Sequence, residues 1–124
     1  MRYLIDTNCC IYLFSNQFPC LTERMGATDQ GDVGLSAIVL AELALGSMNG
    51  KAPPMAALER LLVQMPLMPF DENAAWAYGR MPFRRGRFDR LLAAQALSLD
   101  LVIITRNLAD FADIAGLKVE DWTR

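Results

Sequence analysis

Short apolar runs alternate along the chain with segments that have helical spacing, and this alternation limits the possible folds more than any other feature. A strand, a helix and a further strand form the repeating unit of a parallel sheet. We therefore predict an α/β fold with a mostly parallel central sheet and helices on both of its faces. The expected strands cover residues 3–5, 33–35, 67–70, 101–105 and 117–120. Pro69 places the third strand at an edge of the sheet, because proline cannot donate to a strand ladder.

Helices are expected between the strands, over residues 9–14, 21–25, 37–45, 55–64, 71–79 and 88–97. Ser36 is a suitable N-cap for the third helix, and Gly46 is a suitable residue just after its end. Asp71 caps the fifth helix in the same way. A last helix is expected around Phe111, with Asp110 as its cap.

Length and composition favour one domain that covers residues 1–124. The 124 residues are 53% hydrophobic, which is enough for a core that needs no metal to fold. No apolar run approaches about 18 residues and the N-terminus lacks a signal segment, so no membrane span is expected. Cys9, Cys10 and Cys20 form no C-x-x-C pair, and they favour a reducing cytoplasm as the compartment.

Charge and the lack of histidine limit the chemistry that is open to the chain. The net charge is -2, from 12 basic and 14 acidic side chains, which excludes a protein that wraps nucleic acid through its overall charge. The chain has no histidine, so Ser-His-Asp and Cys-His catalytic sites are excluded, as are zinc sites built on histidine. Carboxylates, amides, hydroxyls and arginines must therefore carry any reaction.

Four polar residues occupy comparable places in the predicted fold. Asp6 and Asn107 follow strands, Glu42 lies about two turns into a helix, and Asp89 opens a helix. Ligands bind at the carboxyl ends of parallel strands. Three carboxylates gathered there would repel one another unless a divalent cation held them, and an oxygen-only ligand set suits Mg²⁺ or Mn²⁺. Such a cation activates water for phosphodiester hydrolysis. Two plainer interpretations remain open, namely Asp6 as a helix N-cap and Glu42 as the solvent-facing residue of its helix.

The order of several short motifs resembles that of the PIN-domain ribonucleases, and among them the VapC-type toxins of bacterial toxin–antitoxin modules. The matching segments are residues 4–8, 35–38, 41–43 with Gly46, 69–71, 88–96, 104–107 and 110–111. They cover nearly the whole chain in the family's order. The resemblance implies a metal-dependent endoribonuclease toxin that forms a homodimer. It also implies a cognate VapB-type antitoxin that blocks the site and makes the contacts to operator DNA.

For the site, the resemblance implies that Asp6 and Asp89 ligate the cation and that Glu42 ligates it or holds its water. Asn107 stands where many relatives carry an Asp, and it would orient the water. Further side chains that could position this water are Thr7, Ser36 and Thr105, which serve equally well as caps and turn residues.

One basic cluster precedes Asp89. Arg84, Arg85 and Arg87 are predicted to form an RNA-phosphate face beside the site, because arginine suits phosphate. A solvated loop or an antitoxin contact is an equally open interpretation of this cluster.

Two other functions remain as alternatives. A PIN-like module that binds nucleic acid or a partner without cleaving RNA would keep the same fold. A phosphoacceptor receiver domain would need an acidic pair after the first strand and a lysine after the last main strand. Asp6 has no acidic neighbour, and the only lysines are Lys51 and Lys118, so the receiver domain is disfavoured.

Overall fold

A parallel five-stranded sheet forms the centre of the computed structural model, which describes residues 1–84 and 87–124. The strands are β1 (Tyr3–Ile5), β2 (Val33–Ser36), β3 (Leu67–Met68), β4 (Val102–Ile104) and β5 (Lys118–Glu120). The helices are α1 (Thr7–Ser15), α2 (Pro19–Ala27), α3 (Ala37–Met48), α4 (Met55–Gln64), α5 (Glu72–Gly79) and α6 (Phe88–Leu99), with a 3₁₀ turn η1 (Leu108–Phe111). The predicted α/β class is confirmed.

The strand order is β3-β2-β1-β4-β5, with β1 in the middle and every neighbouring pair parallel. Tyr3 pairs with Val33 on one side of β1 and with Val102 on the other. The chain builds outward from β1 to β3, then returns to add β4 on the opposite side. The order therefore reverses between β1 and β4, and the ends of these two strands form the crevice where open α/β sheets bind ligands. Pro69 directly follows β3, which is an edge strand as predicted.

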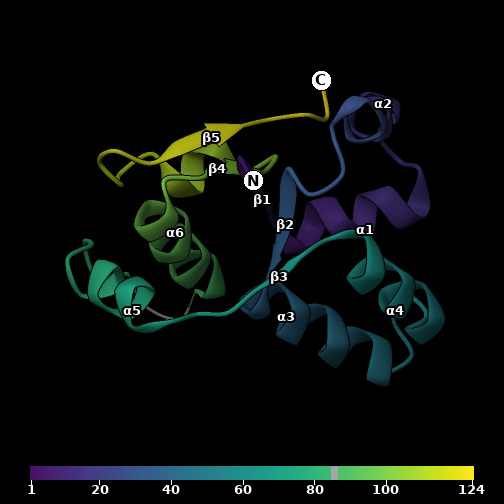
Figure 1. The fold of residues 1–124 in the computed structure, drawn as a ribbon, viewed down its shortest axis with the longest axis horizontal. Coiled ribbons are helices and arrows are strands. Elements are labelled where there is room, and N and C mark those ends of the chain that lie inside the picture. Colours follow the sequence, from purple (N-terminus) through teal and green to yellow (C-terminus); the bar gives the residue numbers. More distant parts are fainter. Residues whose placement is uncertain (85–86) are drawn as a thin grey trace.

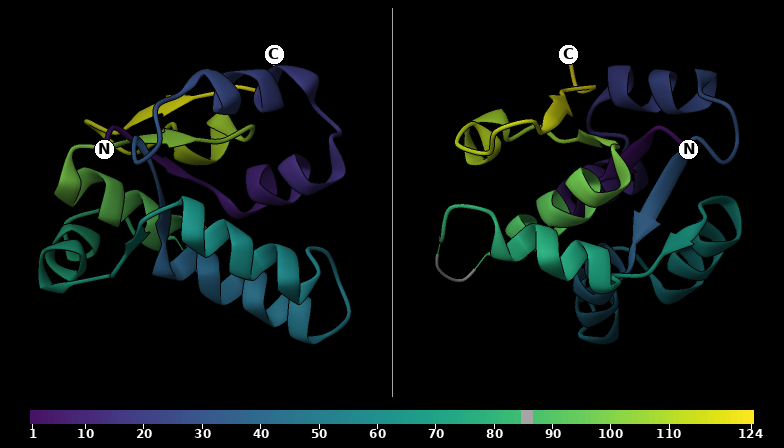
Figure 2. Two further views of the ribbon diagram at one scale, coloured as in Figure 1. Left: turned by 45° about the vertical axis from the view of Figure 1, so that its right-hand side comes forward. Right: turned by 60° about the vertical axis from the view of Figure 1, so that its left-hand side comes forward.

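Helices flank the strands on two sides. Figure 1 shows α1, α2 and α4 to one side of β1 and β2, with α5 and α6 to the other. Figure 2 shows α3 and α4 side by side as a pair, and α5 packs in the same way on α6. Among the described residues, no helix combines the length and the apolar character needed to cross a bilayer.

The core lies between these layers and is built from the central strands. Leu4, Ile5 and Ile103 are fully buried, as expected for strands that are covered on both faces. Cys9 and Cys10 in α1 are buried beside them as small core residues. Burial raises the pKa of both thiols, and the nearby Asp6 carboxylate adds to the effect.

The end of α3 differs from the expectation. The helix continues through Gly46 to Met48, and the backbone N–H of its C-cap residue Asn49 donates to the carbonyl of Gly46. The side chain of Asn49 donates to the carbonyl of Leu45 at 2.7 Å, which satisfies one group of the last turn. The glycine with the positive φ that follows a helix end is Gly50, at 78°.

The segment around Phe111 also differs from the expectation. It is a single 3₁₀ turn, and Asp110 lies inside it, so Asp110 is not a cap. Asn107 occupies the position before the turn, but its side chain makes no cap hydrogen bond. The predicted caps Ser36 and Asp71 are confirmed, since their side chains accept from the backbone N–H groups of Ile38 and Ala74.

Candidate active site

Asp6 joins the ends of β1 and β4. It is the N-cap of α1, where its Oδ1 accepts from the backbone N–H of Cys9 at 2.8 Å. Its Oδ2 accepts from the Thr105 hydroxyl at 2.6 Å, and both side chains are buried. The cap interpretation of Asp6 is thus correct, and the same carboxylate also lines the crevice between the two strands.

Glu42 approaches the same crevice from α3. Its Oε1 accepts from the Thr7 hydroxyl at 2.8 Å, and the side chain is half-buried. The residue therefore faces α1 and the crevice, and it does not mark a solvent-facing stripe of α3.

Asp89 opens α6 on the other wall of the crevice. Its Oδ1 is buried and has no hydrogen-bond partner among the described residues. Burial raises the pKa of Asp89, the positive charge of Arg87 opposes this shift, and the negative charge of Asp110 reinforces it. A buried carboxylate oxygen without a partner is unfavourable unless a further group binds it.

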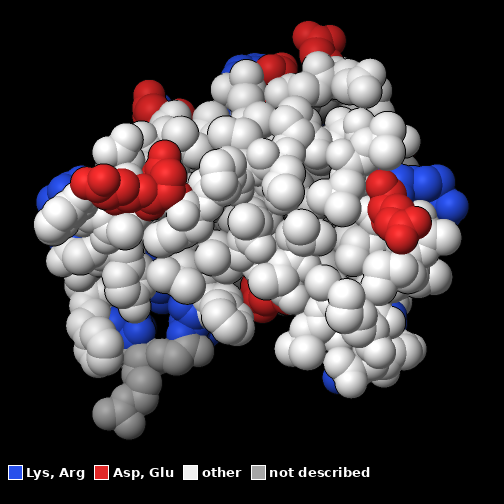
Figure 3. Space-filling view, turned by 60° about the horizontal axis from the view of Figure 1, so that its bottom comes forward, with Lys and Arg blue, Asp and Glu red and all other residues white. Residues whose placement is uncertain are grey.

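These side chains line one cavity of about 320 Å³. The structure brings together all four predicted site residues from separate elements, and their wall is completed by Thr7, Asn8, Arg87, Phe88, Leu92, Thr105, Asp110 and Phe111. Ser36 does not line the cavity, because its hydroxyl is buried against Gln95 and caps α3. Figure 3 shows acidic atoms at the back of the hollow and basic atoms at its edge.

The carboxylates share the cavity but do not meet at one point. Within residues 1–84 and 87–124, no three acidic or cysteine side chains are close enough to hold a metal ion as they stand. Like charges repel one another when no cation lies between them, which favours such a spread. Thr7 and Thr105 hold Glu42 and Asp6 in place on either side.

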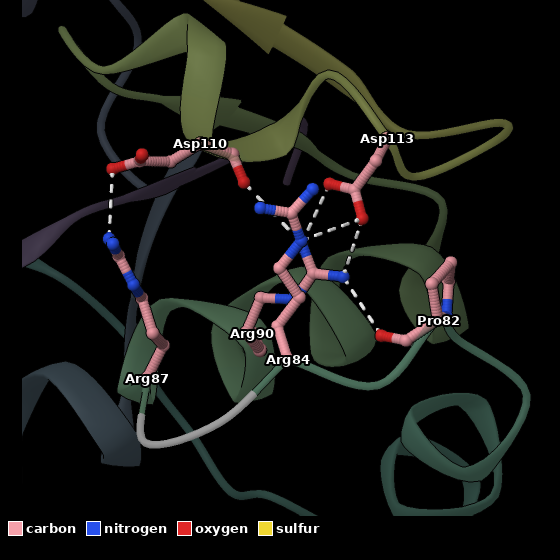
Figure 4. Close-up of polar contacts among 6 residues, drawn as sticks. All are labelled: Pro82, Arg84, Arg87, Arg90, Asp110 and Asp113. Atoms are coloured by element: carbon pink, nitrogen blue, oxygen red, sulfur yellow. Dashed lines mark hydrogen bonds and ion pairs between the residues drawn. The ribbon is translucent and has the colours of Figure 1, made fainter.

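The basic cluster divides into parts with different surroundings. Arg87 lines the cavity, and its Nη1 lies 3.5 Å from Oδ2 of Asp110. Arg84 does not line it, and its Nε lies 3.4 Å from Oδ2 of Asp113 (Figure 4). Arg85 lies outside the described residues. The RNA-phosphate face stays a prediction, and of its two described members Arg87 lies at the cavity and Arg84 does not.

A buried arginine, Arg90, ties the same region together. Its guanidinium is 1% exposed and binds both oxygens of Asp113, at 2.9 and 3.0 Å. It also donates to the carbonyls of Pro82 and Asp110, at 3.0 and 3.4 Å (Figure 4). Arg90 thus anchors the start of α6 to η1 and fixes the wall that carries Asp89.

Sequence reasoning did not assign Phe88 or Asp110 to the site, although both line the cavity. Phe88 is 58% exposed although it is aromatic, and Asp110 was assigned to a cap. The signal for Phe88 was its position directly before Asp89. No local signal identifies Asp110, because its partner Arg87 lies on another element. Neither of the two lysines of the chain, Lys51 and Lys118, lines the cavity, whereas a receiver domain would need one at its site.

Comparison with known proteins agrees with this geometry. The PIN domain family model matches residues 3–117. The chain is 30% identical to the tRNA(fMet)-specific endonuclease VapC of Shigella flexneri, with 99% of each chain covered. It is 33% identical to Ribonuclease VapC1 of Haemophilus influenzae strain R2866, with 100% of each chain covered.

Solved structures show the same similarity. The DNA-bound VapBC of Salmonella typhimurium contains a chain that superposes with a TM-score of 0.87 at 29% identity, with 98% of each chain covered. VapBC-1 from nontypeable Haemophilus influenzae gives a TM-score of 0.82 at 30% identity, with 100% of each chain covered. The chain therefore belongs to the PIN-domain family, and within that family to the VapC ribonucleases.

Proposed function

We propose that this protein is a divalent-cation-dependent endoribonuclease whose site consists of Asp6, Glu42, Asp89 and Asn107. The observation that carries the proposal is the buried Oδ1 of Asp89, which has no described partner and belongs to a residue that lines one cavity with the carboxylates of two other elements. A cation is the group that would relieve both the unpaired oxygen and the repulsion between carboxylates.

The donor set fits Mg²⁺ or Mn²⁺, because all of its ligands are oxygens. Asp6 and Asp89 would ligate the ion directly, and Glu42 would ligate it or hold the attacking water. When bound, such an ion polarises water for attack on a phosphodiester and offsets the charge of the phosphate. Thr105 and Thr7 keep Asp6 and Glu42 oriented through their hydroxyl groups. Asn107 offers a neutral oxygen and N–H donors, which suit the orientation of a water molecule.

The biological role follows from the relatives. Those named above are a tRNA endonuclease and a ribonuclease, and the superposed structures are VapBC complexes, one of them bound to DNA. We infer that this chain is the toxin of a toxin–antitoxin pair, that a VapB-type antitoxin blocks its site, and that operator DNA is contacted through the antitoxin. We also expect a homodimer that acts on RNA in the cytoplasm.

The test is an RNA cleavage assay with purified protein. Internal cleavage is expected with Mg²⁺ or Mn²⁺ and should stop in excess EDTA. Asp6→Asn and Asp89→Asn should abolish it while the far-ultraviolet circular dichroism stays unchanged, since Asn retains the capping ability of Asp6. Glu59→Gln, on the exposed face of α4, is the matched control and should cleave normally. Undiminished activity in EDTA contradicts the proposed site. RNA binding without any cleavage would instead indicate the inactive binding module.

A further inference from the structure

Two residues of different chemistry stand directly before Asp89 at the rim of the acidic cavity. Arg87 is the N-cap residue of α6 and Phe88 is its first residue. Both side chains line the cavity, and they are 56% and 58% exposed. Any ligand that reaches the carboxylates from this side passes the guanidinium of Arg87 and the aromatic ring of Phe88.

The guanidinium of Arg87 retains capacity for an anion. Its ion pair with Asp110 is one contact of 3.5 Å, which is long for a hydrogen bond. Arg90, by contrast, is buried and binds Asp113 through two short contacts, so both of its Nη groups are committed to the fold (Figure 4). A guanidinium has five N–H donors and binds phosphate well. Arg87 is therefore held at the rim by Asp110 with donors left for a phosphate.

The ring of Phe88 offers a face for stacking. An exposed aromatic side chain by itself is ordinary on protein surfaces. Here the ring borders the cavity that holds the acidic residues, and its neighbour is the arginine just described. Bases of single-stranded RNA stack on aromatic rings, whereas bases inside a duplex have no free face.

The chain also contains a matched pair outside the cavity. Phe83 is 81% exposed, and Arg84 is 61% exposed with its charge paired to Asp113. Neither lines the acidic cavity. These residues have the same side-chain types and comparable exposure, so they control for general charge and hydrophobicity.

We propose that Arg87 and Phe88 together bind one nucleotide of single-stranded RNA at the rim of the acidic cavity, with the guanidinium on its phosphate and the ring on its base. The proposal rests on the proposed function for the choice of RNA, and it adds the two residues that would bind an unpaired nucleotide beside the acidic cavity. Arg84 takes no part in this contact.

Binding of a fluorescein-labelled, mixed-sequence single-stranded oligoribonucleotide, measured by fluorescence anisotropy in EDTA, tests the proposal. Phe88→Ala should raise Kd roughly 5- to 150-fold, the range of one base stacked on an aromatic ring. Arg87→Gln should lower the slope of log Kd against log salt by about 0.7, the value for one single-strand phosphate. Phe83→Ala and Arg84→Gln should change neither quantity. All four substitutions are at exposed sites, and equal thermal midpoints would show that the variants are folded.

A series of oligoribonucleotides with one abasic nucleotide at successive positions locates the stacked base. One position should weaken binding to the wild-type protein as much as Phe88→Ala does, and it should cause no further loss in that variant. The fully base-paired form of the same sequence should bind both proteins equally. The proposal is overturned if the abasic nucleotide and Phe88→Ala weaken binding additively at every position. It is also overturned if Phe83→Ala and Phe88→Ala weaken binding equally.

Cleavage measured in parallel with Mn²⁺ separates this proposal from the proposed function. If the wild-type protein cleaves RNA but Arg87→Gln and Phe88→Ala bind RNA like the control variants, the nucleotide site is overturned and the nuclease function stands. If the variants show the predicted changes in RNA binding but the wild-type protein does not cleave RNA, the nuclease function is overturned and the nucleotide site is supported. Absence of RNA binding by the wild-type protein overturns the nucleotide site.

Discussion

Replacing Asp89 by asparagine should stabilise the protein when divalent cations are absent. The substitution removes a charge whose Oδ1 is buried without a described partner. It also relieves repulsion from Asp110, while it gives up an attraction to Arg87. The shape of the side chain is kept, so no cavity is created.

An unpaired buried polar group costs about 1–3 kcal/mol, and asparagine keeps such a group but not its charge, so the gain is the part of that cost that depends on the charge. Asp89 is half-buried and Arg87 lies nearby, so the low end applies, and we expect a gain of about 1 kcal/mol in the free energy of unfolding. For a domain of this size the gain corresponds to roughly 4 °C in the thermal midpoint.

The gain should depend on pH in a defined direction. Burial raises the pKa of Asp89 in the folded state, so the charged form is penalised by folding. Protonation removes the penalty, so the free energy of unfolding of the wild-type protein rises relative to that of Asp89→Asn as the pH falls. The difference between the two proteins should therefore be largest at neutral pH and vanish below the unfolded pKa of about 3.9.

Divalent cations should reverse the order. A ligand of the folded state at one hundred times its Kd stabilises by about 2.7 kcal/mol, which exceeds the gain from the substitution. Thermal unfolding in EDTA and in Mn²⁺, at neutral and acidic pH, measures all of these effects. Glu59→Gln is the control and should stay within about 0.5 kcal/mol of the wild-type protein. Equal stabilisation of the wild-type protein and Asp89→Asn by Mn²⁺, or an undiminished difference at low pH, would refute the reasoning.

Further outcomes are expected for Asn107, for Arg90 and its partner Asp113, and for cells that express the chain. Asn107→Ala should change the free energy of unfolding by less than about 0.5 kcal/mol, since the side chain makes no cap hydrogen bond, but it should slow RNA turnover about 10–100-fold. Asn107→Asp should tighten Mn²⁺ binding, measured by calorimetry, and should lower the thermal midpoint in EDTA. Arg90→Met should cost roughly 1.5–3 kcal/mol in urea unfolding because it removes the charge-assisted hydrogen bonds of a buried guanidinium, against less than about 1 kcal/mol for the surface pair in Arg84→Met. Arg90 lowers the pKa of Asp113, so the contribution of their pair is present at neutral pH and is lost as the pH falls through that lowered pKa. Expression of the chain alone should arrest bacterial growth, and co-expression of its antitoxin should restore it; normal growth at high expression of the folded protein would argue against a toxin.

The order of the elements could be predicted because it depends on local patterns. The alternation of apolar runs gave the parallel sheet, and Pro69 identified the edge strand. The predicted end of α3 was wrong because Gly46 was treated as a helix terminator, although a glycine inside a helix costs only about 1 kcal/mol of stability. Asn49 and Gly50, three and four residues later, supply the actual end of the helix.

The site could be predicted only as far as strand ends indicate it. Asp6 and Asn107 follow β1 and β4, and the structure places both at the same cavity. The role of Asp110 could not be predicted, because the pair with Arg87 depends on how η1 packs beside α6. The division of the arginines has the same origin, since Asp113 takes up Arg84 and Arg90 through tertiary contacts.

The hydrogen bond between Asp6 and Thr105 joins residues that are 99 positions apart in the chain. During translation Asp6 is made well before Thr105, and α6 with Asp89 is made between them. Because β4 and the residues after it must emerge before the cavity is complete, a growing chain that already carries Asp6 and Glu42 still lacks part of the proposed site. A nuclease that depends on this site stays harmless to RNA during that interval, in which an antitoxin can already be present.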